Sequence, residues 1–246
     1  MGSVLIVGGA TGIGRATALA LAAAGDVVTL ADLDLAGADR VAAASSGRIV
    51  PVACDAGSVD GPAAAVDAAV AAGGGLDTLI ANAGVLIARP LAEWTAEDWD
   101  RSMAVNVRGP FLLAQAAAPH LARSSNASII FTASTGAFRG HAGMPAYAAS
   151  KAALVNLVRA LADELSPSGI RVNAVCPGWI DTPFNDPHWD HQADADAART
   201  ELERAIPMRR QGTPDDVVGT MRFLASPDSA YVTGTAIVVD GGYLAP

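Results

Sequence analysis

The feature that most constrains the fold is a regular alternation of short apolar runs with longer alanine-rich stretches. Each run has the length of a strand, and its apolar residues are nearly continuous, as in strands that are buried on both faces. The stretches between them have the length of helices, and strand-helix repeats need right-handed crossovers. The sequence therefore predicts an α/β fold, a doubly wound seven-stranded parallel sheet with helices on both faces. The runs lie at residues 4–7, 27–30, 49–52, 76–81, 128–132, 170–175 and 236–239.

The composition favours one domain that spans residues 1–246. With 51% hydrophobic residues, the chain can bury one large core. The net charge is -9 and the arginines are scattered, so we expect no nucleic-acid partner. No apolar run approaches the roughly 20 residues that span a bilayer, so we expect no membrane partner. Cys54 and Cys176 have no metal-ligand spacing and suggest buried thiols in a reducing compartment. A cytoplasmic protein is the expectation.

A glycine-rich turn follows the first apolar run directly, and an alanine-rich helix begins at about Ile13. Glycines allow a tight turn and let a pyrophosphate approach the N-terminus of the helix, where free N–H groups favour negative charge. Asp32 ends the second strand twenty residues after Gly12, which is the spacing of a Rossmann dinucleotide site. The candidate cofactor-binding residues of the turn are Gly8, Thr11, Gly12, Ile13 and Gly14.

The carboxylate of Asp32 indicates which dinucleotide the turn binds. It can accept hydrogen bonds from both adenosine ribose hydroxyls, whereas it would repel a 2′-phosphate. The sequence therefore predicts NAD as the cofactor. Arg15 follows the turn and could hold a 2′-phosphate, so NADP stays open as the alternative.

The only lysine of the chain, Lys151, stands four residues after Tyr147. On a helix this spacing places both side chains on one face, so an ammonium can lower the pKa of the neighbouring phenol. A tyrosine with a lowered pKa can act as a general acid or base. The alternative is an ordinary surface pair on an amphipathic helix.

Further motifs stand in order around this pair, and together they resemble the short-chain dehydrogenase/reductase family over essentially the whole chain. One departure is visible, because the glycine turn of the family usually begins with threonine and Val7 stands in that place here. The loss of a hydroxyl bears on the rigidity of the turn more than on chemistry. The motifs are Asn82-Ala83-Gly84, Asn106, Ser134, Pro177-Gly178, residues 212–216 and Asp240-Gly241-Gly242.

The resemblance implies a catalytic role for four residues. Tyr147 would be the general acid/base, and Lys151 would lower its pKa and donate to the nicotinamide ribose. Ser134 would hydrogen-bond the substrate oxygen and stabilise the charge that develops there. Asn106, within a helix, would hold a water that links Lys151 to solvent. Taken alone, Asn106 would be an ordinary polar helix residue.

The same resemblance implies further contacts to the cofactor. Asn82, Ala83 and Gly84 would line the adenosine-ribose side, and Asp55 would meet the adenine amino group. For Asp55 the alternative is an acid that caps a turn or helix. The nicotinamide end would be met by Pro177, Gly178, Ile180 and Thr182.

The region of residues 183–212 contains several prolines and acids, and we expect it to form a lid over the site. Residues between Ser134 and Tyr147 and after the sixth strand could wall a mostly apolar substrate pocket with one or two polar anchors. They are Phe138, Arg139, His141, Met144, Trp179, Phe184 and Trp189. Arg139 could instead hold a substrate carboxylate. His188 and His191 form an HxxH pattern, but nothing in the sequence supplies a fixed second shell, so we expect no metal.

These observations favour an NAD-dependent oxidoreductase that interconverts a secondary alcohol and its ketone. The alternative is a catalytically silent dinucleotide-binding regulator on the same fold. A halide-releasing lyase would lack the lysine and the glycine turn, and a hydrolase would need a G-x-S-x-G turn that is absent. Members of the family usually form tetramers through two long helices, here expected at residues 99–120 and 147–165. We therefore expect a homotetramer.

Overall fold

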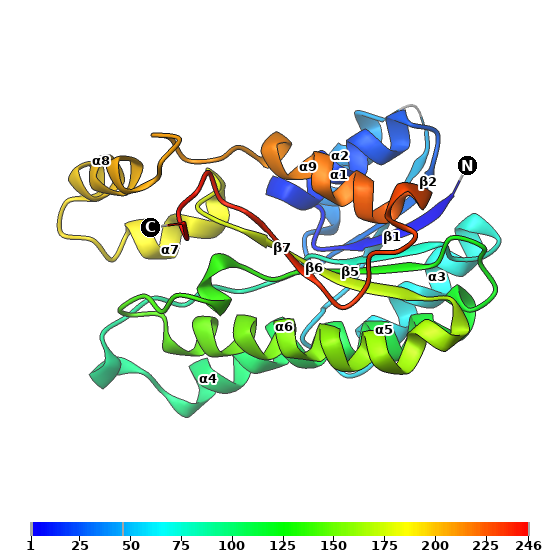
Figure 1. The fold of residues 1–246 in the computed structure, drawn as a ribbon, viewed down its shortest axis with the longest axis horizontal. Helices are drawn as coiled ribbons and strands as arrows, with labels where there is room; N and C mark the ends of the chain where they lie inside the picture. Colours follow the sequence, from blue (N-terminus) through cyan, green and yellow to red (C-terminus); the bar gives the residue numbers. More distant parts are fainter. Residues whose placement is uncertain (1, 46, 246) are drawn as a thin grey trace.

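A computed structural model describes residues 2–45 and 47–245. Seven parallel strands form one sheet in the order β3-β2-β1-β4-β5-β6-β7, so the predicted doubly wound sheet is confirmed (Figure 1). Each of the seven apolar runs forms one of the strands. The strands are β1 (Ser3–Val7), β2 (Val27–Asp32), β3 (Ile49–Ala53), β4 (Thr78–Ala81), β5 (Ser128–Thr132), β6 (Arg171–Pro177) and β7 (Ala236–Val239).

Helices cover both faces of the sheet. Figure 1 shows α1, α2 and α9 on one face and α3 to α6 on the other, while α7 and α8 project beyond one end of the strands. The helices are α1 (Gly12–Ala23), α2 (Leu35–Ala43), α3 (Gly61–Gly73), α4 (Ala96–Met103), α5 (Gly109–Leu121), α6 (Pro145–Leu165), α7 (Asp186–Trp189), α8 (Ala195–Ala205) and α9 (Pro214–Ala225).

The core consists of two apolar layers, one on each face of the sheet. Successive residues of a strand point to opposite faces, so a strand with two covered faces must be apolar throughout. All five residues of β1 are buried, and so are all five of β5. In β1, Leu5 packs into the layer under α3 and α5, while Ile6 packs into the layer under α1 and α9. Burial on both faces explains why the strands were visible in the sequence.

The long helix expected at residues 99–120 is interrupted. Residues Ala104–Arg108 form a π-helical turn between α4 and α5. Pro110 lacks an N–H group and cannot donate to the carbonyl of Asn106 four residues earlier. A widened turn at this point is the physical result, and it places Asn106 at the interruption. The second expected helix is continuous, since α6 runs from Pro145 to Leu165.

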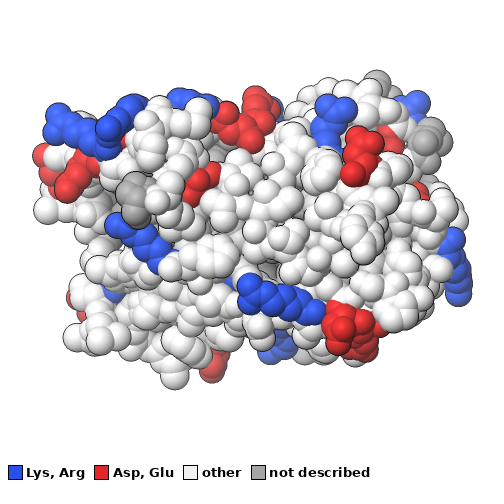
Figure 2. Space-filling model, in the orientation of Figure 1, with Lys and Arg blue, Asp and Glu red and all other residues white. Residues whose placement is uncertain are grey.

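The surface has no continuous basic stripe on the face seen in Figure 2, where charged side chains stand singly or in small mixed groups. Among the described residues, no helix combines the length and hydrophobicity that a bilayer span requires. The two cysteines are free and buried, as the sequence predicted.

The strand order changes direction between the neighbouring strands β1 and β4. From β1 the chain proceeds to β2 and β3 on one side, and from β4 it proceeds to β5, β6 and β7 on the other. In open α/β sheets this switch point leaves a crevice at the carboxyl ends of the strands, because the connections leave in opposite directions. The loops that follow β1, β4, β5 and β6 all meet there.

Candidate active site

A cavity of about 380 Å³ lies at the carboxyl ends of the strands. It brings together every predicted catalytic and cofactor-binding residue except Gly14 and Asn106, which do not line it. The predicted residues that line it are Gly8, Thr11, Gly12, Ile13, Asp32, Asp55, Asn82, Ala83, Gly84, Ser134, Tyr147, Lys151, Pro177, Gly178, Ile180 and Thr182.

The glycine turn fits a pyrophosphate in shape and in charge. Gly8 and Gly12 have φ angles of +88° and +54°, a conformation that side chains disfavour. A Cβ atom at Gly14 would lie 2.1 Å from the carbonyl oxygen of Gly8, so this glycine allows the helix to pack against the turn. Thr11 precedes α1 without a side-chain cap, and the first turn has no acidic residue. The N–H groups at the start of α1 are therefore free to bind an anion.

Asp32 is held in place by the backbone. Its two carboxylate oxygens accept hydrogen bonds from the N–H groups of Ala10, at 2.8 Å, and Asp34, at 2.9 Å. Each oxygen keeps a second lone pair, so the carboxylate can still accept from ribose hydroxyls. Arg15 is exposed and does not line the cavity.

The position of Asp55 is compatible with both roles considered for it. One oxygen accepts a hydrogen bond from the N–H of Gly57 at 2.8 Å, which makes Asp55 a turn residue. The side chain also lines the cavity. The second oxygen is thus free to accept from an adenine amino group.

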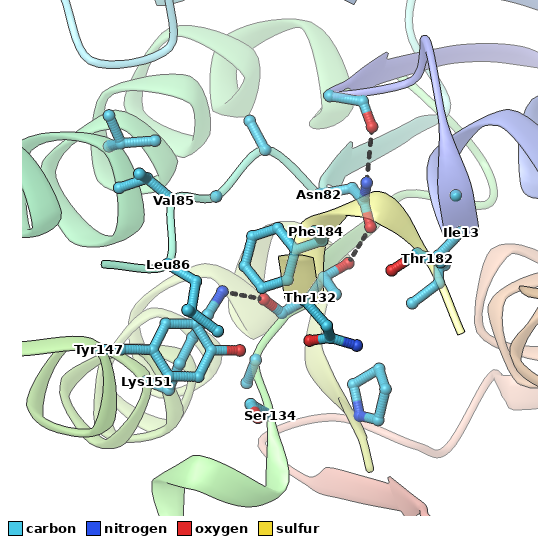
Figure 3. A pocket seen from close by; sticks show the side chains of 18 of the residues that line it. Ile13, Asn82, Val85, Leu86, Thr132, Ser134, Tyr147, Lys151, Thr182 and Phe184 are labelled. Carbon is cyan, nitrogen blue, oxygen red and sulfur yellow. Dashed lines mark hydrogen bonds between the residues drawn. The ribbon is translucent and has the colours of Figure 1, made fainter. Parts of the chain in front are cut away.

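A chain of hydrogen bonds connects the glycine turn to Lys151 (Figure 3). The amide of Asn82 donates to the carbonyl oxygen of Gly8 at 2.6 Å and accepts from the hydroxyl of Thr132 at 2.9 Å. The ammonium of Lys151 donates to the carbonyl oxygen of Thr132 at 2.8 Å. The side chain of Asn82 therefore braces the turn rather than reaching toward a ligand. Thr132 joins the two halves of the site, and sequence reasoning missed it because a polar residue at the end of a buried strand has no distinctive pattern.

Asn106 is fully buried behind the cavity wall. Its amide accepts from the N–H of Val85 at 2.8 Å and donates to the carbonyl of Val85 and the hydroxyl of Ser150, both at 3.0 Å. The side chain thus ties the loop after β4 to α6, the helix that carries Tyr147 and Lys151. Both N–H groups of the amide are thus used, so a water held by this residue would have to donate to the second lone pair of the amide oxygen or to the backbone carbonyl.

The electrostatics of Tyr147 correct one expectation. Burial raises the pKa of Tyr147 to about 12, and a hydrogen bond with Ser134 acts in the opposite direction. Lys151 was expected to lower this pKa, but its Nζ lies 5.7 Å from the centre of the Tyr147 ring. Its ammonium is directed at Thr132 instead. In the protein alone, Tyr147 is therefore a protonated phenol at neutral pH.

Burying the ammonium of Lys151 costs free energy. The side chain is 3% exposed, and within residues 2–45 and 47–245 it has no ion-pair partner. Burial lowers its pKa from the ordinary value of 10.5 to about 8. The site thus holds a cation that is charged at neutral pH and readily gives up its proton.

The substrate end of the cavity is mostly apolar. Gly136 lies directly beside the catalytic candidates, since a Cβ there would be 3.2 Å from the Tyr147 ring and 3.3 Å from the Ser134 hydroxyl. Figure 3 shows the ring of Phe184 over the cavity that Tyr147 and Ser134 also face. Of the residues expected to wall the substrate pocket, His141, Met144, Trp179 and Phe184 line the cavity, whereas Phe138, Arg139 and Trp189 do not. Lining residues that were not assigned from the sequence include Leu86, Arg101, Thr132, Gly136 and Asn185.

Arg139 and His188 both lie outside the lining of the cavity. The guanidinium of Arg139 lies 4.7 Å over the ring of Tyr243, and its side chain is exposed and outside the cavity lining. His188 packs against Trp179 and Trp189, with ring centres 4.8 and 4.9 Å apart. Among the described residues, no group of three or more potential ligands gathers as a metal site would require.

Comparison with known proteins decides the family. Residues 8–244 match the family model described as enoyl-(acyl carrier protein) reductase. The chain belongs to the short-chain dehydrogenase/reductase family. This family consists of oxidoreductases that use nicotinamide dinucleotides, which agrees with the fit of the turn and of Asp32 to such a group.

Relatives of this short-chain dehydrogenase/reductase cover nearly its full length. It is 36% identical to the 3-oxoacyl-[acyl-carrier-protein] reductase FabG of Thermotoga maritima, over 97% of this chain and 96% of the relative. It is 37% identical to the 2-dehydro-3-deoxy-D-gluconate 5-dehydrogenase of Escherichia coli, over 99% and 96%. The structure of levodione reductase superposes with a TM-score of 0.94 at 32% identity, over 98% and 97%. A 3-ketoacyl-(acyl-carrier-protein) reductase of Brucella melitensis, solved with NADH, gives 0.90 at 35%, over 98% and 97%.

The buried ammonium predicts an unusual effect of Lys151→Met on stability. Because the folded state lowers the pKa of Lys151 from 10.5 to about 8, the parent protein bears the full cost of this group below pH 8. That cost is about 3 kcal/mol, and it disappears as the pH rises from 8 to 10.5. Lys151→Met should therefore raise the free energy of unfolding by roughly 2–3 kcal/mol at pH 7 and by much less at pH 10. Urea denaturation at both pH values measures the difference, and a variant less stable than the parent at pH 7 would contradict the cost assigned to this cation.

Proposed function

We propose that the protein is an NAD-dependent oxidoreductase that interconverts a secondary alcohol and its ketone. The observation that carries the proposal is the meeting of two sets of groups in one cavity. Ser134, Tyr147 and Lys151 line it at one end, and the glycine turn with Asp32 lines it at the other. A hydroxyl pair that can hold a substrate oxygen thus lies within reach of a site that fits a dinucleotide.

Tyr147 and Ser134 have different roles in ketone reduction. Bound NAD(H) would supply the hydride carrier. In ketone reduction, Tyr147 donates its proton to the substrate oxygen, and burial keeps that proton in place until it is needed, because it raises the pKa of Tyr147 to about 12. Ser134 donates a hydrogen bond to the same oxygen and stabilises the charge that develops on it.

Alcohol oxidation needs Tyr147 as a base, which the buried phenol resists. The ammonium of Lys151 favours the phenolate by charge attraction. With its own pKa lowered to about 8, Lys151 can also pass a proton onward near neutral pH. We assign the next step of that path to a water on the backbone carbonyl of Asn106, since Pro110 cannot donate to this carbonyl. Asn106 therefore supports the reaction through its backbone.

NAD rather than NADP is part of the proposal. Asp32 lines the ribose end of the cavity, and the backbone fixes its carboxylate there. A 2′-phosphate beside it would meet like-charge repulsion, and the exposed Arg15 lies outside the cavity lining. The related reductase of Brucella melitensis was solved with NADH, which agrees with this choice.

The substrate is a small carbonyl compound or alcohol with an apolar body. The relatives act on acyl, sugar-acid and levodione substrates by their names, so family membership alone does not select one. The substrate end of this cavity combines Leu86, Met144, Trp179 and Phe184 around Ser134 and Tyr147. An aromatic or alicyclic body fits such a wall best.

A silent regulator on this fold is the alternative. Such a protein would bind the dinucleotide but would not need groups that handle protons. Here Ser134, Tyr147 and Lys151 all line the cavity, and the ammonium of Lys151 is buried with no counter-ion among the residues that the structure describes. A structural cost of this kind is typical of catalytic sites, so the enzyme is favoured.

Residues 183–212 form the lid in this proposal. The segment leaves and returns at one point, because the N–H of Asp181 donates to Gly212 at 2.8 Å and the N–H of Gly212 donates to Trp179 at 2.9 Å. Between these ends lie α7 and α8, and Phe184 reaches into the cavity. A segment tied at its base and otherwise connected by short helices can open without disturbing the sheet. Amide exchange that is as slow here as in the sheet, and unchanged by ligand, would exclude a lid.

A cytoplasmic homotetramer is the expected form. The two free, buried thiols accord with a reducing compartment. A groove between α4, α5 and α6 is lined mostly by apolar side chains, among them Trp99 and Phe111, which are 43% and 39% exposed. The alanines of α6 in this groove, Ala153 and Ala160, allow a second copy to pack closely. Light scattering should give the mass of a tetramer, and a monomer mass would contradict this assembly.

Removing the phenolic hydroxyl should abolish the reaction. Tyr147→Phe removes the group that exchanges the proton, so kcat should fall about a thousandfold or more, and Ser134→Ala should lower it about a hundredfold. Nicotinamide absorbance over a panel of alcohols and ketones measures both. Tyr231→Phe is the matched control, because Tyr231 is fully exposed and should leave kcat unchanged. Equal rates in Tyr147→Phe and the parent would refute the proposed mechanism.

Asp32 should decide between the two dinucleotides. Asp32→Ser replaces the carboxylate by a neutral hydroxyl, which weakens the hydrogen bonds from the ribose hydroxyls and removes the repulsion toward a 2′-phosphate. We expect kcat/KM with NAD to fall about tenfold or more, while the value with NADP rises or stays constant. The exposed Asp39 offers a control on α2, and Asp39→Ser should keep the parent ratio. A parent enzyme that prefers NADP would contradict the role of Asp32.

A further inference from the structure

A stack of aromatic rings forms one side of the substrate end of the cavity. We call it the aromatic wall, and its members come from four separate segments of the chain. His141 and Trp179 line the cavity itself, and the other rings lie behind them. The wall consists of His141, Trp179, His188, Trp189 and Tyr243.

The imidazole of His141 packs against two of these rings. It meets Trp179 edge to face, with ring centres 5.5 Å apart and an angle of 79°. The same imidazole stacks on Tyr243, with ring centres 6.2 Å apart and an angle of 11°. These ring contacts, from Trp179 and Tyr243, fix the position of the imidazole. They leave its two nitrogen atoms unused.

The nitrogens of His141 have no protein partner in the part of the chain that the structure describes. Two other polar groups that line the cavity are occupied: the amide of Asn185 donates to the carbonyl of Ile180 at 2.6 Å, and the hydroxyl of Thr132 donates to Asn82. His141 is thus a polar side chain at the substrate end that is rigidly placed and left without a hydrogen bond. Such a group is typical of a contact that a ligand completes.

The charge state of His141 indicates what that contact is. Burial, and to a lesser extent the nearby Arg139, lower the pKa of His141 below its ordinary 6.5. At neutral pH the ring is therefore uncharged, with one N–H donor and one acceptor nitrogen. An uncharged imidazole suits a hydroxyl or keto group better than a carboxylate, because a carboxylate needs a cation to offset its loss of water. The nearby cations are directed elsewhere: the guanidinium of Arg139 lies over Tyr243, Lys151 donates to Thr132, and Arg101 is an exposed side chain of α4.

We propose that His141 is a specificity-determining residue that binds a second, uncharged oxygen of the substrate. The substrate is then a compact ring with two oxygen functions. One is the carbonyl or alcohol that reacts at Ser134 and Tyr147, and the other is a hydroxyl or keto group that hydrogen-bonds to His141. Trp179 and Phe184 enclose the apolar body between them. This inference rests on the proposed function, because it names the substrate class of the same site.

A matched set of ring ketones tests the assignment. Cyclohexanone and its 3-hydroxy and 4-hydroxy derivatives differ only in the second oxygen, and the readout is the ratio of kcat/KM for each hydroxylated ring to that for cyclohexanone with NADH. The parent should prefer at least one hydroxylated ring about tenfold, mainly through KM. His141→Phe should abolish this preference, and His141→Asn, which keeps a donor and an acceptor, should restore part of it.

The control variant is His191→Phe, because His191 is exposed and does not line the cavity. It should keep the parent ratio. A parent without preference for either hydroxylated ring, or a preference that survives in His141→Phe, would overturn the assignment of His141. If the parent reduces all three rings equally, the proposed oxidoreductase function stands and only this inference fails. If no alcohol or ketone in a wide panel changes nicotinamide absorbance, the proposed function itself fails.

A binding measurement separates recognition from turnover. The chain has four histidines, so 15N-histidine labelling gives few imidazole signals, and His141→Phe identifies one of them. In the Tyr147→Phe protein with NADH, the preferred hydroxylated ring should shift the His141 signal, and cyclohexanone should shift it much less. Equal shifts from both rings would contradict a hydrogen bond to the second oxygen.

Discussion

The structure depends on a buried ammonium group that has no counter-ion in the described chain. Lys151 is 3% exposed and is held by the carbonyl oxygen of Thr132. Thr132 is bonded through its hydroxyl to Asn82, whose amide holds Gly8 of the dinucleotide turn. A charge in such surroundings is costly, and it is tolerated because the carbonyl supplies part of the solvation that water would give. One continuous set of hydrogen bonds therefore fixes both the cation of the reaction and the turn that fits its cofactor.

Irregular features at the edge of the regular sheet position these groups. The switch between β1 and β4 opens the crevice, and Asn82 bridges its two sides at the point of opening. The π-helical turn places Asn106 against the loop after β4 and against Ser150 of α6. Tyr147 and Lys151 thereby stand on a helix that is tied to the sheet from behind. A rigid helix keeps the phenol of Tyr147 at a fixed position relative to a bound substrate oxygen. Proton transfer depends mainly on this positioning.

Most of the fold was predictable from the sequence, and so were most of the catalytic and cofactor-binding residues that line the cavity. Strands buried on both faces are continuous apolar runs, and Tyr147 and Lys151 share a helix, so local spacing carries that information. The remaining features depend on contacts that no local pattern records. Thr132 acts through its backbone and hydroxyl toward two different segments. The interruption at Asn106 follows from Pro110, but its contact with Val85 needs the folded chain. The direction of the Tyr147 pKa was predicted wrongly, because burial outweighs a cation that is bonded elsewhere. The stacking of His141 on Tyr243 joins residues about a hundred positions apart.

The most direct test of the central claim is the pKa of Lys151 itself. Because Lys151 is the only lysine, protein grown with 15N-labelled lysine gives a single side-chain nitrogen signal that needs no assignment. Titration of the folded, ligand-free protein should give a pKa of about 8 for that group. Thr132→Val should leave this value nearly constant, since the backbone carbonyl that holds Lys151 remains. A pKa at or above 10.5 in the folded parent would show a solvated or paired ammonium, and it would contradict the buried, unpaired cation on which the account rests.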